Sequence, residues 1–135
     1  MSNELLTEIT NALVEGKPDE TVELTRKALQ AGIEPLTIIR EGLTEGMDIV
    51  GERFQTGEFF LPNLVIAASG MNQAMEILKP ELKSNQQAAE SLGTVVIGSV
   101  AGDIHEIGKS LVGTMLSVNG FEVHDLGVDV ANEVF

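Results

Sequence analysis

An aspartate and a histidine two residues apart, Asp103 and His105, form the pair in this sequence with the clearest chemical potential. A nearby carboxylate can hold one imidazole nitrogen as an N–H donor, which leaves the other nitrogen free to bind a metal and makes the imidazole a better ligand. Gly108 follows near the start of an expected helix, where the missing side chain lets a bulky group approach the backbone. These residue types alone leave two interpretations open, a metal ligand with its carboxylate partner or an ordinary surface hydrogen bond.

The composition limits which other chemistry and which partners are possible. The chain has no cysteine, which excludes disulfides, thiolate metal sites and a cysteine nucleophile. Eight basic against 21 acidic side chains give a net charge of -13, which disfavours nucleic acid and anionic membrane surfaces as partners. No apolar run approaches the roughly 20 residues of a membrane span. We therefore expect a globular, cytoplasmic protein.

The residues before the Asp–His pair show helical patterning up to about residue 83. Apolar residues recur there at the i, i+3, i+4 spacing of amphipathic helices, and Gly16 ends the first of these repeats. Pro18, Pro35 and Pro62 each suit the first turn of a following helix, the last of which should start near Leu61. This pattern predicts four helices, which is enough for a small bundle.

The expected third helix begins at Pro35 and contains three glycines, Gly42, Gly46 and Gly51. Each glycine costs about 1 kcal/mol relative to alanine inside a helix. We therefore expect another part of the molecule to approach the backbone closely at these positions, and at most of them a packed neighbouring helix.

The chain changes character after a polar stretch from Lys83 to Ser91, which suits a linker between two folding units. A β-branched run over 94–98 predicts a parallel strand buried on both faces. A helix over about 106–118 and a second strand over 121–126 complete one βαβ unit, with the loop after the first strand at the edge where open α/β sheets bind ligands. Because two parallel strands are too few for a doubly wound domain, we expect the natural chain to continue.

The stretch from Gly102 to Asp129, with the motif Asp103-Ile104-His105-Glu106-Ile107-Gly108, resembles the cobalamin-binding domain of corrinoid methyltransferase proteins and methionine synthase. Residues 50–64 are similar to the helical cap module that precedes this domain in those families. Just before Gly102 and Asp103, however, Ser99-Val100-Ala101 departs from the Thr-Val-Lys/Glu that the families usually have there. The resemblance implies an α plus α/β fold: a four-helix bundle cap over 1–88, followed by a truncated Rossmann-like (flavodoxin-like) cobalamin-binding domain over 89–135.

The resemblance also implies a cofactor, cobalamin or a related corrinoid, and roles for residues of the Asp–His loop. His105 matches the axial ligand of the cobalt, and Asp103 matches its hydrogen-bonding partner. Glu106 and Gly108 belong to the same binding motif. Glu106 also fits a simple helix-start acid, which the helix dipole favours.

Four apolar residues match the positions with which the family's cap covers the upper face of the corrin: Phe54, Phe60, Leu61 and Leu64. The alternative is that they are ordinary core residues of the bundle. For Leu64 the two interpretations are evenly balanced. The Phe-Leu-Pro segment fits the corrin contact better than the bundle core, because a loop there would expose aromatic rings if nothing covered them.

The resemblance implies a methyl carrier rather than a catalyst. Such a protein shuttles a methyl group on cobalt between a substrate:corrinoid methyltransferase and a second enzyme, a corrinoid:tetrahydrofolate methyltransferase, with a reductive activator protein as a further partner. The alternative is a cobalamin-dependent sensor or regulatory module, although no DNA-binding module is present. A module of methionine synthase or of a mutase would predict flanking catalytic domains.

Overall fold

The computed structural model describes residues 2–84 and 91–135, and the chain divides into two compact units, Met1–Ala89 and Glu90–Phe135. The sequence placed this boundary between residues 88 and 89. The greater part of the expected polar linker, residues 85–90, lies outside the described residues. Lys83 and Ser84, its first two residues, are the last two residues of a helix.

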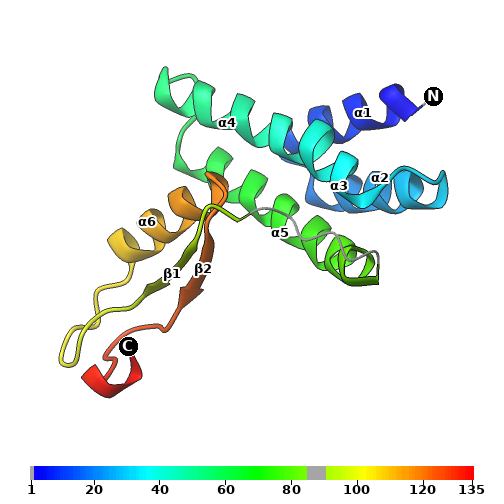
Figure 1. The fold of residues 1–135 in the computed structure, drawn as a ribbon. Helices are drawn as coiled ribbons and strands as arrows, with labels where there is room; N and C mark the ends of the chain where they lie inside the picture. Colours follow the sequence, from blue (N-terminus) through cyan, green and yellow to red (C-terminus); the bar gives the residue numbers. More distant parts are fainter. Residues whose placement is uncertain (1, 85–90) are drawn as a thin grey trace. The chain divides into compact units, whose positions relative to one another are not determined.

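Helices make up the first unit, as Figure 1 shows. The α-helices α2 and α3 begin at Pro18 and Pro35, where the fixed φ of proline suits the first turn, and α5 begins at Leu61 as predicted. Its elements in chain order are α1 (Ser2–Val14), α2 (Pro18–Gln30), α3 (Pro35–Thr37), the π-helix η1 (Ile38–Thr44), α4 (Glu45–Gln55) and α5 (Leu61–Ser84).

The expected third helix differs from the prediction in its middle. The elements α3, η1 and α4 follow one another without a break, but the seven residues of η1 have π geometry. The buried hydroxyl of Thr10 donates a hydrogen bond to the carbonyl oxygen of Gly42 at 2.9 Å, in the middle of this segment. A π segment is often stabilised by such contacts from a neighbouring helix, which helical periodicity does not reveal.

Two of the three glycines in this region confirm the expected close approach, which helix α1 makes. A Cβ atom at Gly42 would lie 3.2 Å from Ile9 Cγ2, and one at Gly46 would lie 2.8 Å from Leu13 Cδ2. At Gly51 the prediction is wrong, because no described atom lies within 4 Å of the Cβ position. The first two glycines thus set how closely α1 packs on η1 and α4.

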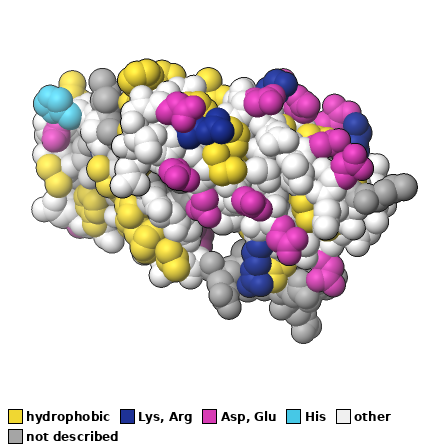
Figure 2. All heavy atoms as spheres, turned by 90° about the horizontal axis from the view of Figure 1, so that it is seen from above, with side chains coloured by type: hydrophobic (Ala, Val, Ile, Leu, Met, Phe, Trp, Pro, Cys, Tyr) yellow, Lys and Arg dark blue, Asp and Glu magenta, His cyan; other side chains and the backbone are white. Residues whose placement is uncertain are grey.

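Exposed carboxylates line the outer side of η1 and α4. They recur at i, i+4, i+7 and i+11 as Glu41, Glu45, Asp48 and Glu52. Figure 2 shows that acidic side chains outnumber basic ones on the face drawn. Like charges one turn apart destabilise a helix by about 0.2–0.5 kcal/mol per pair, so this stretch is stabilised mainly by its buried face. The fully buried side chains of the unit include Ile9, Leu13, Ile38, Leu43, Met47, Val50, Leu64 and Leu78.

The second unit is a βαβ unit, as predicted, and a short 3-10 helix follows it. Strands β1 and β2 pair in parallel, in a register that runs from Thr94 opposite Glu122 to Ile97 opposite Asp125. None of the described helices in either unit is both long and apolar enough to cross a membrane. The elements of this unit are β1 (Thr94–Ile97), α6 (Ile107–Val118), β2 (Glu122–Asp125) and η2 (Asn132–Val134).

Strand β1 is not buried on both faces, and that part of the prediction is wrong. Its burial alternates, with Thr94 and Val96 exposed and Val95 and Ile97 half-buried. Helix α6 covers one face only, where a Cβ atom at Gly113 would lie 3.9 Å from Ile97 Cγ2. Successive side chains of a strand point to opposite faces, so Val96 lies on the other face and keeps 48% of its surface exposed.

Candidate cofactor site

Two loops at the carboxyl ends of the parallel strands build the site. The parallel pairing continues beyond β1 and β2, because Ser99 N–H donates to Gly127 O and Val130 N–H donates to Ser99 O, both at 2.9 Å. Val100 and Val130 form an isolated parallel bridge in the same region. These bonds tie the start of the loop after β1 to the loop after β2, so each of the two loops supports the other.

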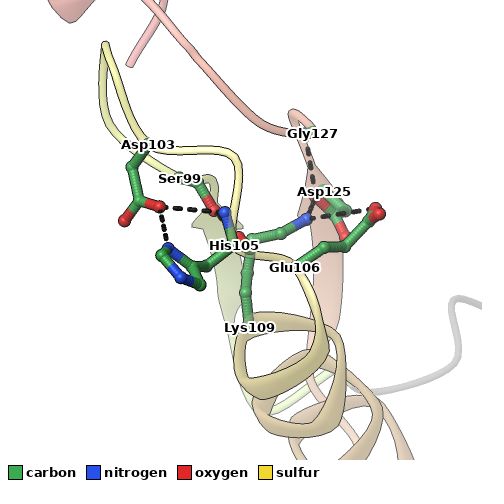
Figure 3. A network of polar contacts seen from close by, with 7 residues as sticks. All are labelled: Ser99, Asp103, His105, Glu106, Lys109, Asp125 and Gly127. Carbon is green, nitrogen blue, oxygen red and sulfur yellow. Dashed lines mark hydrogen bonds and ion pairs between the residues drawn. The ribbon is translucent and has the colours of Figure 1, made fainter.

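His105 projects from the first of these loops, and Asp103 holds it from two directions (Figure 3). One carboxylate oxygen of Asp103 accepts the backbone N–H of His105 at 2.9 Å and lies 2.6 Å from its ring Nδ1. The His105 side chain is 95% exposed. A carboxylate at Nδ1 favours the tautomer with the proton on that nitrogen, so the lone pair of Nε2 is free to bind a metal from outside.

The charge and the anchoring of the loop favour this arrangement. The hydrogen bond from the backbone N–H of His105, and then the bond from its side chain, hold the pKa of the Asp103 carboxyl below its usual value. The hydroxyl of Ser99, which is buried, donates to the carbonyl oxygen of His105 at 2.6 Å. The ring is therefore oriented by a negative charge, and its backbone is fixed at both polar groups.

A second polar network ties the start of α6 to the end of β2. The Nζ atom of Lys109 lies 2.5 Å from a carboxylate oxygen of Asp125 and 4.0 Å from one of Glu106, as Figure 3 shows. The Lys109 side chain is only 7% exposed. The hydrogen bond from Lys109, followed by that from the backbone N–H of Gly127, holds the pKa of the Asp125 carboxyl below its usual value. This network fixes the helix that follows the His105 loop.

Glu106 and Gly108, the other two predicted residues of the loop motif, lie at the start of α6. Glu106 occupies the N-cap position without a side-chain cap bond and is exposed. No described atom lies within 4 Å of the Cβ position of Gly108. The backbone at Gly108 is therefore open to a bulky group, as the sequence interpretation requires.

The four predicted apolar residues lie in the first unit and differ in burial. Phe60 is 70% exposed and Leu61 is 37% exposed, whereas Phe54 is half-buried and Leu64 is fully buried in the core. The side-chain oxygen of Asn63 accepts the backbone N–H of Phe60 at 3.0 Å, which fixes the backbone of Phe60 just before α5. Of the four predicted residues, Phe60 and Leu61 therefore contribute most to the exposed apolar surface.

Sequence reasoning missed several residues that complete the loop geometry. Ser99, Lys109 and Asp125 all contact the loop or the helix that follows it, yet none was a candidate. The signal that could have identified them is topological, since the carboxyl ends of neighbouring parallel strands meet at one edge. Residues at the end of β2 are therefore close in space to the loop that carries His105 and to the helix that follows it.

The structure joins a helical unit to a parallel βαβ unit whose first loop presents an exposed imidazole bound by Asp103, in agreement with the corrinoid-binding class that the resemblance implies. A family model described as the B12 binding domain matches residues 5–79, more than half of the chain. The chain belongs to this B12-binding family, and its cofactor is accordingly cobalamin or a related corrinoid. The matched residues lie in the helical unit, and the match does not extend to the loop that carries His105.

Curated relatives extend the similarity over both units. The chain is 47% identical over 132 residues to monomethylamine corrinoid protein 2 of Methanosarcina acetivorans, and 44% identical over 132 residues to trimethylamine corrinoid protein 1 of the same organism. Each alignment covers 98% of this chain and 61% of the relative. The predicted resemblance to corrinoid proteins is confirmed, and the chain spans about three-fifths of their length.

Solved structures show the same likeness. A chain of the methanol:cobalamin methyltransferase complex of Methanosarcina barkeri matches 94% of this chain with a TM-score of 0.84 and 37% identity, over 48% of its own length. The monomethylamine corrinoid protein of the same organism matches 99% of this chain with a TM-score of 0.63 and 45% identity, over 62% of its length.

Proposed function

We propose that this chain forms part of a methyl-carrier protein, in which His105 is the axial ligand of a corrinoid cobalt. The observation that carries the proposal is the geometry of His105, whose ring is exposed while Asp103 occupies its Nδ1. Membership of the B12-binding family and the similarity to methylamine corrinoid proteins support the same function.

The residues present fit a corrinoid. When bound, the corrinoid supplies a cobalt centre that can accept and release a methyl group. Asp103 would hold the proton on Nδ1, Nε2 would be the atom that binds the metal, and the carboxylate would increase its basicity. Ser99 fixes the backbone from which the ring projects, and the open backbone at Gly108 leaves room beside it.

The proposal extends to the first unit as a four-helix bundle cap that supplies apolar contacts to the corrin. Phe60 and Leu61 have the exposed surface that such a contact needs, and Phe54 is partly available. Leu64 is fully buried, so its side chain supports the cap from within the core. Apolar cover would exclude water from the reactive metal between encounters with partner enzymes.

The partners proposed are the two enzymes between which a methyl carrier works. The likeness to a chain from a methanol:cobalamin methyltransferase complex supports a substrate:corrinoid methyltransferase as the first partner. A corrinoid:tetrahydrofolate methyltransferase and a reductive activator protein are proposed as further partners on the family resemblance alone.

A loading experiment followed by methyl transfer tests this function. The chain is incubated with excess hydroxocobalamin, passed through gel filtration, and compared with His105→Gln and with His124→Gln, which removes the other histidine. We expect the parent and His124→Gln to retain corrinoid with a common visible spectrum, and His105→Gln to lose that spectrum.

The loaded parent is then reduced and mixed with methylamine methyltransferases and each donor amine, and methylation is followed by the change in the visible spectrum. Methylation that depends on both enzyme and amine supports the carrier function. Retention of corrinoid without methylation by any donor system would favour the sensor alternative instead.

A further inference from the structure

Asp129, in the loop after β2, has a backbone conformation that its residue type adopts rarely. Its φ is 50°, and among residues 2–84 and 91–135 it is the one non-glycine residue with a positive φ. Such conformations persist where the surrounding contacts hold them, and they concentrate at functional sites. The contacts of Asp129 are therefore informative.

Asp129 binds the backbone of the loop after β1 at two neighbouring residues, Gly102 and Asp103. Its carboxylate oxygen accepts the backbone N–H of Gly102 at 2.8 Å, and its own backbone N–H donates to the carbonyl oxygen of Asp103 at 2.9 Å. Asp103 N–H in turn donates to Val100 O at 3.0 Å, which closes a β-turn. Gly102 has a φ of 85° in this turn, as the third residue of a type II turn requires.

These bonds link Asp129 to His105 through Asp103. The turn fixes the position from which the Asp103 side chain leaves the backbone, and that side chain holds the ring Nδ1 at 2.6 Å. The turn has few other restraints, since the loop residues from Ala101 to Glu106 are exposed except for Asp103. Without Asp129, the turn keeps its internal bond and the pairing of Val100 with Val130, but it loses the contacts that hold Gly102 and Asp103 themselves.

We propose that Asp129 is a positioning residue that sets the ring tautomer of His105 by clamping the turn that carries Asp103. From this left-handed backbone, the side chain and the N–H of Asp129 reach the N–H of Gly102 and the carbonyl oxygen of Asp103. The proposal deepens the proposed function, since it concerns the same axial ligand, but it is a statement about the protein without its cofactor. An experiment can therefore contradict the proposed function without contradicting this inference, and the reverse.

Nitrogen NMR of the histidine rings tests the proposal directly. Long-range 1H–15N spectra of the 15N-labelled chain are recorded at about pH 8.5, well above the ordinary histidine pKa, so that ring shifts report the tautomer. The His124→Gln background leaves one ring signal. Three variants are compared with this parent: Asp129→Gly, Asp129→Asn and Asp125→Asn.

Each variant isolates one part of the proposal. Asp129→Gly keeps the left-handed backbone and removes the carboxylate, whereas Asp129→Asn keeps a neutral and weaker acceptor. Asp125→Asn is the matched control, because it removes an equal charge close by, at the end of β2, but Asp125 contacts Lys109 and Gly127 rather than Asp103.

The parent is expected to show the Nδ1–H form. Asp129→Gly should move the ring shifts toward the Nε2–H form and raise the exchange rate of the Gly102 amide about tenfold, because that amide loses its acceptor. Asp129→Asn should change the ring shifts and the Gly102 exchange rate in the same direction but to a smaller extent. Asp125→Asn should leave the ring shifts at parent values.

Unchanged ring shifts in Asp129→Gly would overturn the proposal, and so would equal shifts in Asp129→Gly and Asp125→Asn, which would indicate general loosening of the loops. If Asp129→Gly does not fold, Asp129→Asn decides, and parent-like ring shifts together with parent-like Gly102 exchange would overturn the proposal. If His105→Gln keeps the corrinoid spectrum of the loaded parent while the ring shifts change as expected, the proposed function is overturned and this inference stands.

Discussion

Two alanine substitutions in the same helix, Gly46→Ala and Gly51→Ala, should change the stability of the helical unit in opposite directions. Both lie inside α4, so both gain about 1 kcal/mol of helix propensity. The Cβ atom at Gly51 meets no described atom within 4 Å, so this gain should appear almost in full. At Gly46 the new atom would lie 2.8 Å from Leu13 Cδ2 and 3.3 Å from Thr10 O, so contact energy opposes the gain.

The cost of the contact that Gly46→Ala introduces depends on how little the Leu13 side chain can move. Its side chain is 1% exposed, and its other methyl group, Cδ1, lies 3.2 Å from the Cβ position of Gly70 on α5. Overpacking a core of this kind costs about 1–3 kcal/mol, and the blocked movement places this case in the upper half of that range. A cost of about 2–3 kcal/mol against a gain of about 1 kcal/mol leaves Gly46→Ala about 1–2 kcal/mol less stable than the parent.

Urea and thermal unfolding, followed by far-ultraviolet circular dichroism, measure both effects. One kcal/mol corresponds to roughly 4–8 °C in Tm for a domain of about this size. Gly51→Ala should therefore melt several degrees above the parent and Gly46→Ala several degrees below it. Equal stabilisation by the two substitutions would refute the reasoning, because it would mean that Leu13 moves aside at no cost and that α1 does not limit the packing at Gly46.

Three further predictions address the other contacts. Thr10→Val should destabilise the helical unit by about 1–2 kcal/mol in urea unfolding, because the buried hydroxyl that donates into η1 is lost, whereas Thr10→Ser should stay close to the parent; equal effects would contradict a role for the hydroxyl. Asp125 has a folded-state pKa below its ordinary 3.8, so its bond to Lys109 stabilises the fold above that pH and loses this contribution as the pH falls through the folded value. Lys109→Met should thus reduce stability at neutral pH more than at acid pH, as urea unfolding across pH would show, and a pH-independent loss would contradict this account. Phe60→Ser should leave Tm nearly unchanged and weaken corrinoid retention in gel filtration, whereas Leu64→Ala should cost about 2–5 kcal/mol of stability; a large drop in Tm for Phe60→Ser would show that the ring belongs to the core.

Local signals in the sequence predict the helical unit well. The prolines at the starts of α2 and α3, and Pro62 next to the start of α5, determine those helix starts through a fixed backbone angle. Helical periodicity did not reveal the π geometry of η1, and the hydroxyl that bonds to its Gly42 carbonyl comes from α1, which is distant in the sequence. The openness at Gly51 was missed for the same reason, because a glycine in a helix does not say which neighbour approaches it.

In the candidate site, too, local contacts could be predicted from the sequence and contacts between distant segments could not. Asp103 and His105 are two residues apart, so their contact is local and the motif predicts it. The clamp by Asp129 joins loops that follow different strands, and only the pairing of those strands brings them together. The exposure of Val96 was also unpredictable from composition, because a run of β-branched residues fits a strand covered on one face as well as on both.

The identity of the axial nitrogen on cobalt is the measurement that tests the central claim most directly. The chain is prepared with ordinary histidine and with 15N-histidine, loaded with a corrinoid and reduced to the Co(II) state, and the electron paramagnetic resonance spectrum is recorded. A coordinated 14N nucleus splits the signal into triplets and a 15N nucleus splits it into doublets.

If His105 is the axial ligand, the triplets become doublets on labelling, both persist in His124→Gln, and nitrogen splitting from the protein disappears in His105→Gln. Triplets that survive labelling would show that the nitrogen belongs to the cofactor's own base, and would contradict the assignment of His105.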